Sequence, residues 1–385
     1  MEDVSFAFAI PYLIIAVIQL LLYGKERILL KLNRSPQKVR SLSFFILLVF
    51  VGLRGFLYTD FVNYYVGFED VPKLYELTIS DLKSTGSEIG FYLYESLFKT
   101  IVNNYHVWCF FNSFIDLFVI REVFKRYTSS SILPFVFFIA YWGLQFEFNL
   151  MRNVKGLLFF LISLKSLEVG NFRRYIICNF LGCLFHSSSL IYIIIYPFLR
   201  IKWKRGVLLV IFLGVNILYL SGICLGKMSA DFFLDMLGTK SSEKVLDYVM
   251  GASDMGITIG YVERVIEMLL FIIFLDKFRV INRCADVFIS CSILYFTLYS
   301  LFSDVAIFVQ RFPLLFIIGY WILLSNLFYI QFKTKKLVLS FIICLCMTRI
   351  VLSNNTIISK YDNIIWGIES YELRRNAVYR FTDYN

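Results

Sequence analysis

Charged residues and histidines are scarce in this chain of 385 residues. Charged residues make up 17% of the sequence and histidine occurs twice, whereas hydrophobic residues make up 59%. An ordinary soluble domain is about 45–50% apolar and about 25% charged. A soluble core has no room for 42 Phe and 25 Tyr in addition to this much Leu and Ile. The composition therefore excludes an assembly of soluble domains and predicts an all-α, polytopic integral membrane protein.

Motifs for nucleotide, cofactor and metal binding are absent as well. The sequence contains no P-loop, GxGxxG, HExxH or GxSxG pattern, so a nucleotide-driven pump or a soluble-type dehydrogenase has no support. None of the eight cysteines forms a CxxC pair or joins a His cluster, and nearly all lie in apolar runs. We interpret them as small buried residues. We therefore expect no cofactor and no bound metal.

Apolar runs that can cross a bilayer recur along the chain. The first, from Val4 to Tyr23, has no basic segment before it and no small-residue cleavage site after it. It is therefore interpreted as a transmembrane helix and not as a signal peptide. No repeat or Pro/Gly-rich linker divides the runs, which predicts a single transmembrane domain over residues 1–385. About twelve spans are predicted, at residues 4–24, 41–57, 105–122, 132–148, 154–168, 175–186, 187–200, 206–225, 259–275, 285–302, 305–330 and 337–352.

The basic residues predict the orientation in the membrane. Of the 38 Lys and Arg residues, 22 lie in short loops that alternate along the chain, at 25–40, 121–131, 165–175, 200–206, 276–284 and 331–336. Such loops are expected on the cytoplasmic side, which places both termini on the outer side. Because the basic residues occur in these short clusters, the net charge of +10 does not indicate a nucleic-acid partner.

Three polar segments on the predicted outer face are longer than simple turns. They cover residues 58–104, 226–258 and 353–385. The first contains an amphipathic stretch from Glu88 to Val102, which is typical of a helix that lies at the membrane interface or re-enters the membrane. Long segments on one face point to recognition or chemistry on that face.

Charges close to the membrane are the most informative residues. A charge at a helix centre costs about 2.5–3.5 kcal/mol on insertion scales, so each one is a candidate functional residue. Four arginines lie at or near predicted outer helix ends, namely Arg54, Arg152, Arg264 and Arg311. Together they would form a strong anion site, because the guanidinium fork matches phosphate oxygens. Lys155, one helical turn after Arg152, could join them; the alternative for each is snorkelling or pairing with a carboxylate.

Candidates for proton transfer lie on the same predicted face. His186 lies between two half-length apolar runs, and an unperturbed histidine titrates near pH 6.5, which suits a general base. Asp60 and Glu88 are the acidic candidates, and Tyr64 is a candidate for stacking on a sugar ring. The alternatives are a hydrogen-bonded structural histidine, and an N-cap or an ion pair with Arg54 in the case of Asp60.

At these residues the sequence resembles a known family. The run from Val51 to Tyr64, VGLRGFLYTDFVNY, resembles the segment of EpsG-like proteins in which an arginine is followed by Thr-Asp-x-x-x-Tyr. Those proteins belong with the Wzy-type polymerases of bacterial surface polysaccharides. Glu88-Ile-Gly90, Leu150-Met-Arg152 and Phe185-His186-Ser-Ser-Ser are similar to later landmarks in the same order. The chain departs from the family at Tyr58, where glycine is frequent, and at Asn153, where glutamine is frequent.

The resemblance implies a GT-C-like membrane glycosyltransferase in the bacterial inner membrane that needs neither metal nor nucleotide. Its partners would be membrane lipids, repeat units linked to undecaprenyl diphosphate and a chain-length regulator. A growing glycan would be transferred from the diphosphate to the terminal hydroxyl of a new unit on the outer leaflet. The arginines would hold the diphosphate, and His186, Asp60 or Glu88 would take the proton.

Two other classes of membrane protein compete with this interpretation. A flippase for lipid-linked oligosaccharides would also have about twelve helices and a cationic cavity, but its cations should lie at the midplane. A sugar O-acyltransferase could use His186 and arginines, but its polar site should open toward the cytoplasm. The outer-side clustering of the arginines favours the polymerase.

Overall fold

The computed structural model describes the chain except for residues 1–2, 224, 226–256, 310 and 384–385. Most of the predicted outer segment 226–258 therefore lies outside the described residues. In the described ranges the chain is helical and contains no strand, with three isolated β-bridges as its only extended pairing. This confirms the all-α prediction.

The chain divides into two compact units, the first formed by residues 1–196 and 333–385 and the second by residues 197–332. The helices of the first unit are α1 (Phe6–Lys31), α2 (Gln37–Gly52), α3 (Phe61–Asp70), α4 (Ile79–Ser84), α5 (Ile89–Ile101), α6 (Tyr105–Tyr127), α7 (Leu133–Ala140), α8 (Gly143–Phe148), α9 (Met151–Glu168), α10 (Phe172–Cys183), η1 (Ser187–Ser189), α11 (Leu190–Ile194), α21 (Lys335–Ser353), η3 (Ile357–Ser359) and α22 (Tyr371–Asp383). The short helix α12 (Tyr196–Leu199) lies at the boundary.

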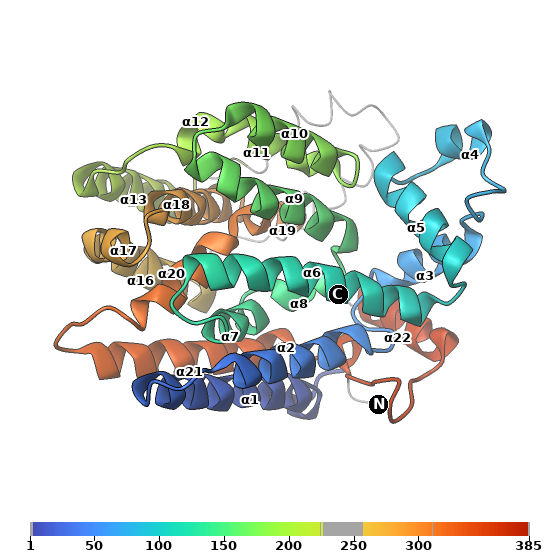
Figure 1. Cartoon of the computed structure of the whole chain (residues 1–385), viewed down its shortest axis with the longest axis horizontal. Helices are drawn as coiled ribbons and strands as arrows, with labels where there is room; N and C mark the ends of the chain where they lie inside the picture. The colour runs from blue at the N-terminus through green and yellow to red at the C-terminus, as the bar shows by residue number, and fades with distance from the viewer. Residues whose placement is uncertain (1–2, 224, 226–256, 310, 384–385) are drawn as a thin grey trace. The chain divides into compact units, whose positions relative to one another are not determined.

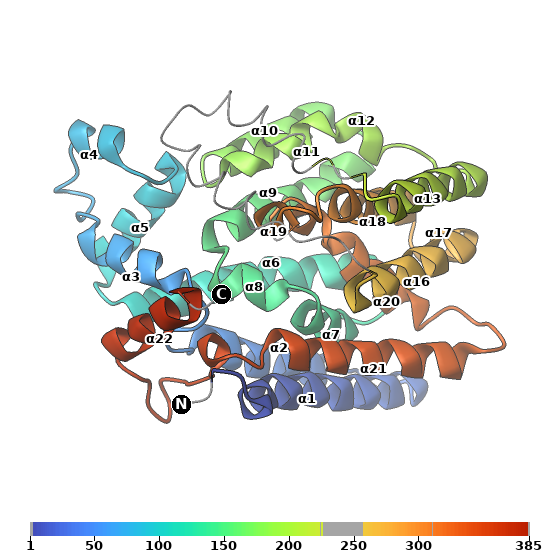
Figure 2. The same ribbon diagram turned by 180° about the vertical axis from the view of Figure 1, so that it is seen from behind.

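The long helices of the first unit pack side by side. α1 packs against α21, α7 and α2, and the contacts continue from α2 to α6, from α6 to α9 and from α9 to α10. Figures 1 and 2 show this series from opposite sides. Every residue of α7 is buried, so this helix forms part of the core. The helices α3, α5 and α22 gather at one end of the series (Figure 1).

The second unit is built around α18. Its helices are α13 (Arg205–Leu220), α16 (Ile259–Ile273), α17 (Leu275–Ile281), α18 (Ala285–Leu301), α19 (Ala306–Val309), η2 (Pro313–Phe316) and α20 (Ile318–Leu327). α18 packs against α20, η2, α13, α16 and α17. All ten residues of α20 are buried, which makes α18 and α20 the core of this unit.

Two of the described helices, α1 and α21, are long and apolar enough to cross a membrane, with 26 and 19 residues. α13, α18 and α20 are apolar but shorter. Several predicted spans are broken helices. The span 132–148 is divided into α7 and α8 at Trp142, whose φ of 63° lies in the left-handed region. The span 187–200 is divided into η1, α11 and α12, and the span 305–330 into α19, η2 and α20. The predicted count of twelve transmembrane helices is therefore not confirmed.

The C-terminal segment supports the chain that follows α2. The Tyr58 amide donates to the Ile358 carbonyl at 2.9 Å, and the Ile364 amide donates to the Leu53 carbonyl at 2.9 Å. Arg374 in α22 is buried, with 3% of its surface exposed. Its guanidinium donates to the Phe56 carbonyl at 2.7 Å and to the Ile358 carbonyl at 3.2 Å. Residues 53–60 are thus held by hydrogen bonds to a segment about 300 positions later in the sequence.

Replacing Arg374 with alanine is expected to destabilise this end of the first unit. A hydrogen bond to a charged group contributes about 1.5–3 kcal/mol. The variant leaves the Phe56 carbonyl without its donor, whereas the Ile358 carbonyl keeps the Tyr58 amide. We expect faster proteolysis of the segment after residue 353 and a lower unfolding temperature in detergent. The control is Arg375→Ala, because Arg375 is more exposed and pairs with Glu372 on its own helix. Equal proteolysis rates and equal unfolding temperatures for the two variants would contradict this role of Arg374.

Candidate functional site

A polar cavity of about 100 Å³ lies between the start of α3, the first half of α5 and the start of α9. Its lining carries carboxylate, amide, hydroxyl and guanidinium groups. The lining residues are Asp60, Asn63, Tyr64, Gly67, Ser87, Phe91, Glu95 and Arg152. Three of the residues predicted from the sequence, Asp60, Tyr64 and Arg152, therefore face one cavity.

Asn149, which follows α8, holds the two residues that precede α3. The Asn149 Oδ1 accepts hydrogen bonds from the amides of Thr59 and Asp60, both at 3.1 Å, and its Nδ2 donates to Thr59 Oγ1 at 3.1 Å. The Tyr64 hydroxyl donates to the Asn149 carbonyl at 3.3 Å. Asp60 is the N-cap residue of α3, but its side chain makes no capping hydrogen bond to the helix. The Asn149 side chain thus positions Thr59 and Asp60, and the Asn149 backbone carbonyl positions Tyr64.

Tyr58, the first departure from the family pattern, adopts a φ of 64°. This left-handed conformation costs a non-glycine residue about 1–2 kcal/mol, which explains why glycine suits the position. Two contacts offset the cost here. The Tyr58 hydroxyl donates to Asn354 Oδ1 at 2.6 Å, and its ring lies 5.3 Å from that of Phe148. The chain therefore keeps the left-handed turn before Asp60 although position 58 is not glycine.

Glu88, the N-cap residue of α5, joins two other predicted residues. Its Oε2 accepts a hydrogen bond from Arg152 Nη1 at 3.0 Å, and its Oε1 lies 3.9 Å from His186 Nε2. The same Oε1 accepts from the Ser187 amide at 3.3 Å. Arg152, Glu88 and His186 thus form a continuous polar chain that ends at the cavity through Arg152.

The hydrogen bonds of His186 assign its tautomer. The Ser188 amide donates to Nδ1 at 3.2 Å, and Ser188 Oγ lies 2.6 Å from the same nitrogen. Since Nδ1 accepts from a backbone N–H, a neutral ring carries its proton on Nε2, which faces Glu88. A ring in this state has no lone pair to offer on the Glu88 side. The arrangement therefore favours a positioning role for His186 over a role as the base.

Glu95 also lines the cavity, although the sequence analysis did not select it. It lies on α5 and only 4% of its surface is exposed. Burial raises the pKa of Glu95 to about 8, and the nearby Arg152 guanidinium lowers it. The available signal was its position in the amphipathic stretch, because Glu95 is four residues after Phe91 and three before Phe98 on the apolar face. Asn149 and Arg374 were also missed, and no short-range pattern marks them.

Arg54 and Lys155 lie outside the cavity lining. Arg54 is buried and donates to the carbonyls of Val51 and Glu147, both at 2.7 Å, and to Ser113 Oγ at 3.1 Å. Lys155 is buried in an ion pair with Asp116 at 2.5 Å. Three residues along a helix advance about 4.5 Å, which carries Lys155 past the cavity even though it follows Arg152 by one turn. Both cations thus hold helices together in this structure.

Arg264 and Arg311 belong to the second unit. Arg264 is buried, donates to the Tyr295 hydroxyl at 3.1 Å and lies 3.6 Å from the centre of the Tyr299 ring. Arg311 is exposed. Joint action of all four arginines therefore stays a prediction. Among the described residues, no cluster of three or more His, Cys, Asp or Glu side chains is placed to hold a metal ion.

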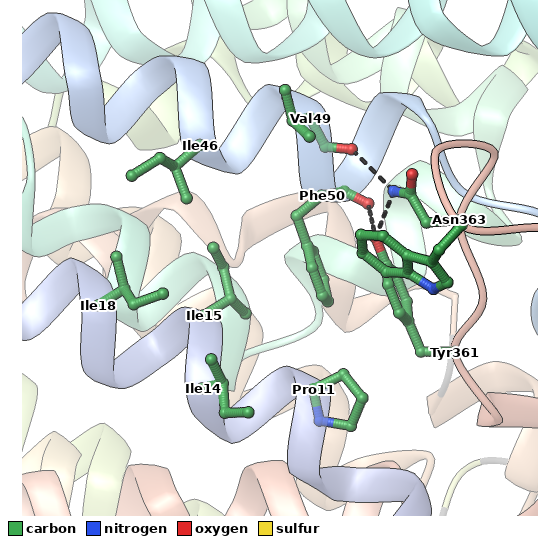
Figure 3. Close-up of a pocket in the computed structure, with 10 residues that line it drawn as sticks. Pro11, Ile14, Ile15, Ile18, Ile46, Val49, Phe50, Tyr361 and Asn363 are labelled. Carbon is green, nitrogen blue, oxygen red and sulfur yellow. Dashed lines mark hydrogen bonds between the residues drawn. The ribbon is translucent and has the colours of Figure 1, made fainter.

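An apolar groove of about 400 Å³ runs along α1 and α2 beside the C-terminal segment. Its lining is aliphatic at one end and aromatic at the other, with Pro11, Ile14, Ile15, Ile18, Ile46, Val49, Phe50, Tyr361, Asn363 and Trp366 (Figure 3). The Tyr361 ring stacks on Phe50 with centroids 4.3 Å apart, and its hydroxyl donates to the Phe50 carbonyl at 2.7 Å. The groove lies on α1, one of the two described helices that are long and apolar enough to cross a membrane.

The helical fold and its apolar spans fit an integral membrane protein with a polar cavity in its first unit. The chain belongs to the EpsG family, whose family model matches residues 38–365. This membership indicates a polysaccharide polymerase-type role and confirms the resemblance seen in the sequence. Comparisons with curated proteins and with solved structures give no match.

Proposed function

We propose that this protein is a glycosyltransferase that extends a bacterial surface polysaccharide from lipid-linked repeat units. The observation that carries the proposal is the cavity in which Asp60 and Arg152 face the same space. A carboxylate and a guanidinium at one polar site supply the two functions that glycosyl transfer from a diphosphate requires, proton removal and stabilisation of the leaving group.

In the proposed reaction, the hydroxyl oxygen of the acceptor sugar attacks the anomeric carbon of the donor glycan. The bond from that carbon to the diphosphate oxygen breaks, and the lipid diphosphate leaves with the bonding electron pair. Arg152 stabilises the charge that develops on the diphosphate, since its planar fork matches two phosphate oxygens. The donor already carries an activated bond, so no nucleotide is consumed.

We assign removal of the hydroxyl proton to Asp60 in preference to Glu88 or His186. Asp60 lines the cavity and accepts from the Thr59 hydroxyl at 3.2 Å. Glu88 is not among the lining residues and accepts from Arg152 and the Ser187 amide. The tautomer of His186 directs its N–H toward Glu88. A well-placed base contributes about 10²–10⁴ in rate. Glu88 and His186 would then keep Arg152 in position.

The proposed site works on the outer leaflet of the bacterial cytoplasmic membrane, and the lipid substrate carries undecaprenyl diphosphate. The remaining apolar segments would bring the chain to about twelve crossings. The apolar groove on α1 and α2 supports a lipid substrate, because its aliphatic lining suits part of an isoprenoid tail.

The test is reconstitution of the pure protein in liposomes with the organism's own lipid-linked repeat unit and no nucleotide. We expect a ladder of products spaced by one repeat unit, since each turnover adds one block. A fluorescent lipid-linked unit that crosses the bilayer without any ladder would overturn the proposal in favour of a flippase. In a parallel reaction supplied with an acyl thioester as donor, acyl groups on unpolymerised units without any ladder would overturn it in favour of an O-acyltransferase.

A further inference from the structure

One carboxyl group of the cavity has no role in the reaction as proposed. Glu95 is 4% exposed and lines the cavity. Within the part of the chain that the structure describes, no backbone or side-chain group hydrogen-bonds to its carboxyl. Buried polar groups in proteins are nearly always hydrogen-bonded, and leaving one unsatisfied costs about 1–3 kcal/mol. The carboxyl oxygens of Glu95 are reached from the cavity, so a group bound there can supply the hydrogen-bond partner that the protein does not.

The basic residues nearest to Glu95 are engaged elsewhere. Lys99 lies one helical turn later on α5, but its ammonium donates to the Phe68 carbonyl at 3.0 Å and to the Glu69 carbonyl at 2.5 Å. Arg152 faces the same cavity, but its Nη1 is bonded to Glu88 at 3.0 Å. An ionised Glu95 would thus be a buried charge without a contacting cation, which is unfavourable in an apolar surrounding.

We propose that Glu95 is a substrate-binding residue which keeps its proton and binds two neighbouring hydroxyls of a sugar in the cavity. The carboxylic acid donates one hydrogen bond through its O–H and accepts another at its second oxygen. A pair of adjacent hydroxyls on a sugar ring offers the matching acceptor and donor. The inference rests on the proposed function for the identity of the ligand, and it adds that the bound sugar carries two adjacent free hydroxyls.

Two neighbours of Glu95, Tyr64 and Arg152, do not change their protonation state in the pH range in which Glu95 titrates. Burial raises the pKa of Tyr64 to about 12, and an arginine stays charged at any pH at which the protein is active. At neutral pH Glu95 is protonated, because its own pKa is raised to about 8 by burial. The remaining titratable groups that line the cavity with Glu95 or interact with it electrostatically are Asp60 before α3, Tyr92 and Tyr94 on its own helix, and Cys109 on α6.

The first test compares the pH dependence of polymer formation in the wild type and in Glu95→Gln. Loss of the proton on raising the pH from about 7 to about 9 should lower the wild-type rate about tenfold, as expected for a group that titrates near 8. The amide keeps a donor and an acceptor and does not ionise, so the ratio of its rates at the two pH values should stay near one. The control is Glu69→Gln, which changes an exposed carboxylate of the same segment and should follow the wild type. An equal alkaline fall in Glu95→Gln would overturn the inference.

The second test does not depend on turnover. Infrared difference spectra are recorded for the wild type and Glu95→Gln with the lipid-linked repeat unit as the probe. We expect a carbonyl stretch of a protonated carboxylic acid that disappears toward pH 9, is absent from the variant and moves to lower frequency when the probe binds. The same shift without any product ladder would overturn the proposed reaction and support Glu95 as a sugar-binding acid. A ladder without the Glu95 band would overturn this inference and leave the reaction in place.

Discussion

Replacing Arg152 with alanine is expected to lower the rate of polymer formation by about 10²–10³-fold, the range seen when one donor to a developing negative charge is removed. Arg152 faces the cavity, and 32% of its side chain is exposed, so its removal should not disrupt a packed core. Arg152→Lys keeps the charge but loses the planar fork, and we expect an intermediate rate. The rates are measured in the liposome assay, with product length read from the ladder.

The control for Arg152 is Arg375→Ala, which removes a more exposed arginine that pairs with Glu372. It should form ladders like those of the wild type. A second comparison separates the two roles of Arg152. If the arginine only held Glu88, Arg152→Ala and Glu88→Gln would have the same effect and the double variant would add nothing. Long products at the wild-type rate from Arg152→Ala would remove the diphosphate role.

Replacing Gly90 with alanine is expected to lower the rate about 10²-fold, because small displacements of reacting groups have effects of this size. The amide of Gly90 donates to the Leu184 carbonyl at 2.7 Å, which holds the start of α5 against the turn before His186. A Cβ at Gly90 would lie 2.6 Å from the Leu184 oxygen and 2.8 Å from the Leu184 Cβ. The start of α5 must move away, and Glu88 moves with it from His186 and Arg152.

The control for Gly90 is Gly86→Ala, since a Cβ at Gly86 would meet no atom within 4 Å. Overpacking typically destabilises a protein by about 1–3 kcal/mol, so thermal unfolding is measured in parallel with the rate. We expect Gly90→Ala to stay folded at the assay temperature while its rate falls. Equal rates for the two glycine variants would show that contact between α5 and the Leu184 turn does not matter for activity.

The departures from the predicted spans have local causes. The run 132–148 is apolar enough for one helix, but Trp142 turns the chain through the left-handed region and ends α7. Hydropathy cannot detect such a turn, because it measures composition and not backbone conformation. The run 305–330 contains Pro313, which begins the 3₁₀ turn η2 and separates it from α19.

The sequence by itself determined the class of protein and the main candidate residues. Scarce charge and recurrent apolar runs predict a helical membrane protein, since only a bilayer accommodates that composition. The cost of charge near a membrane selected Arg152. Residue type and position on the predicted outer face selected Asp60, Tyr64, Glu88 and His186, and the family pattern contains the same residues. All five lie at the cavity or in the polar chain that leads to it.

Only the tertiary structure decided which charges face the cavity and which hold helices together. Arg54 and Arg152 look alike in the sequence, yet Arg54 bonds to Val51, Ser113 and Glu147. In the sequence Glu95 is an ordinary member of an amphipathic helix, whereas in the structure it lines a cavity together with residues of α3 and α9. The physical reason is that a side chain's partners come from segments far away in the sequence. Composition sets the cost of burying a charge, whereas packing sets which partner offsets that cost.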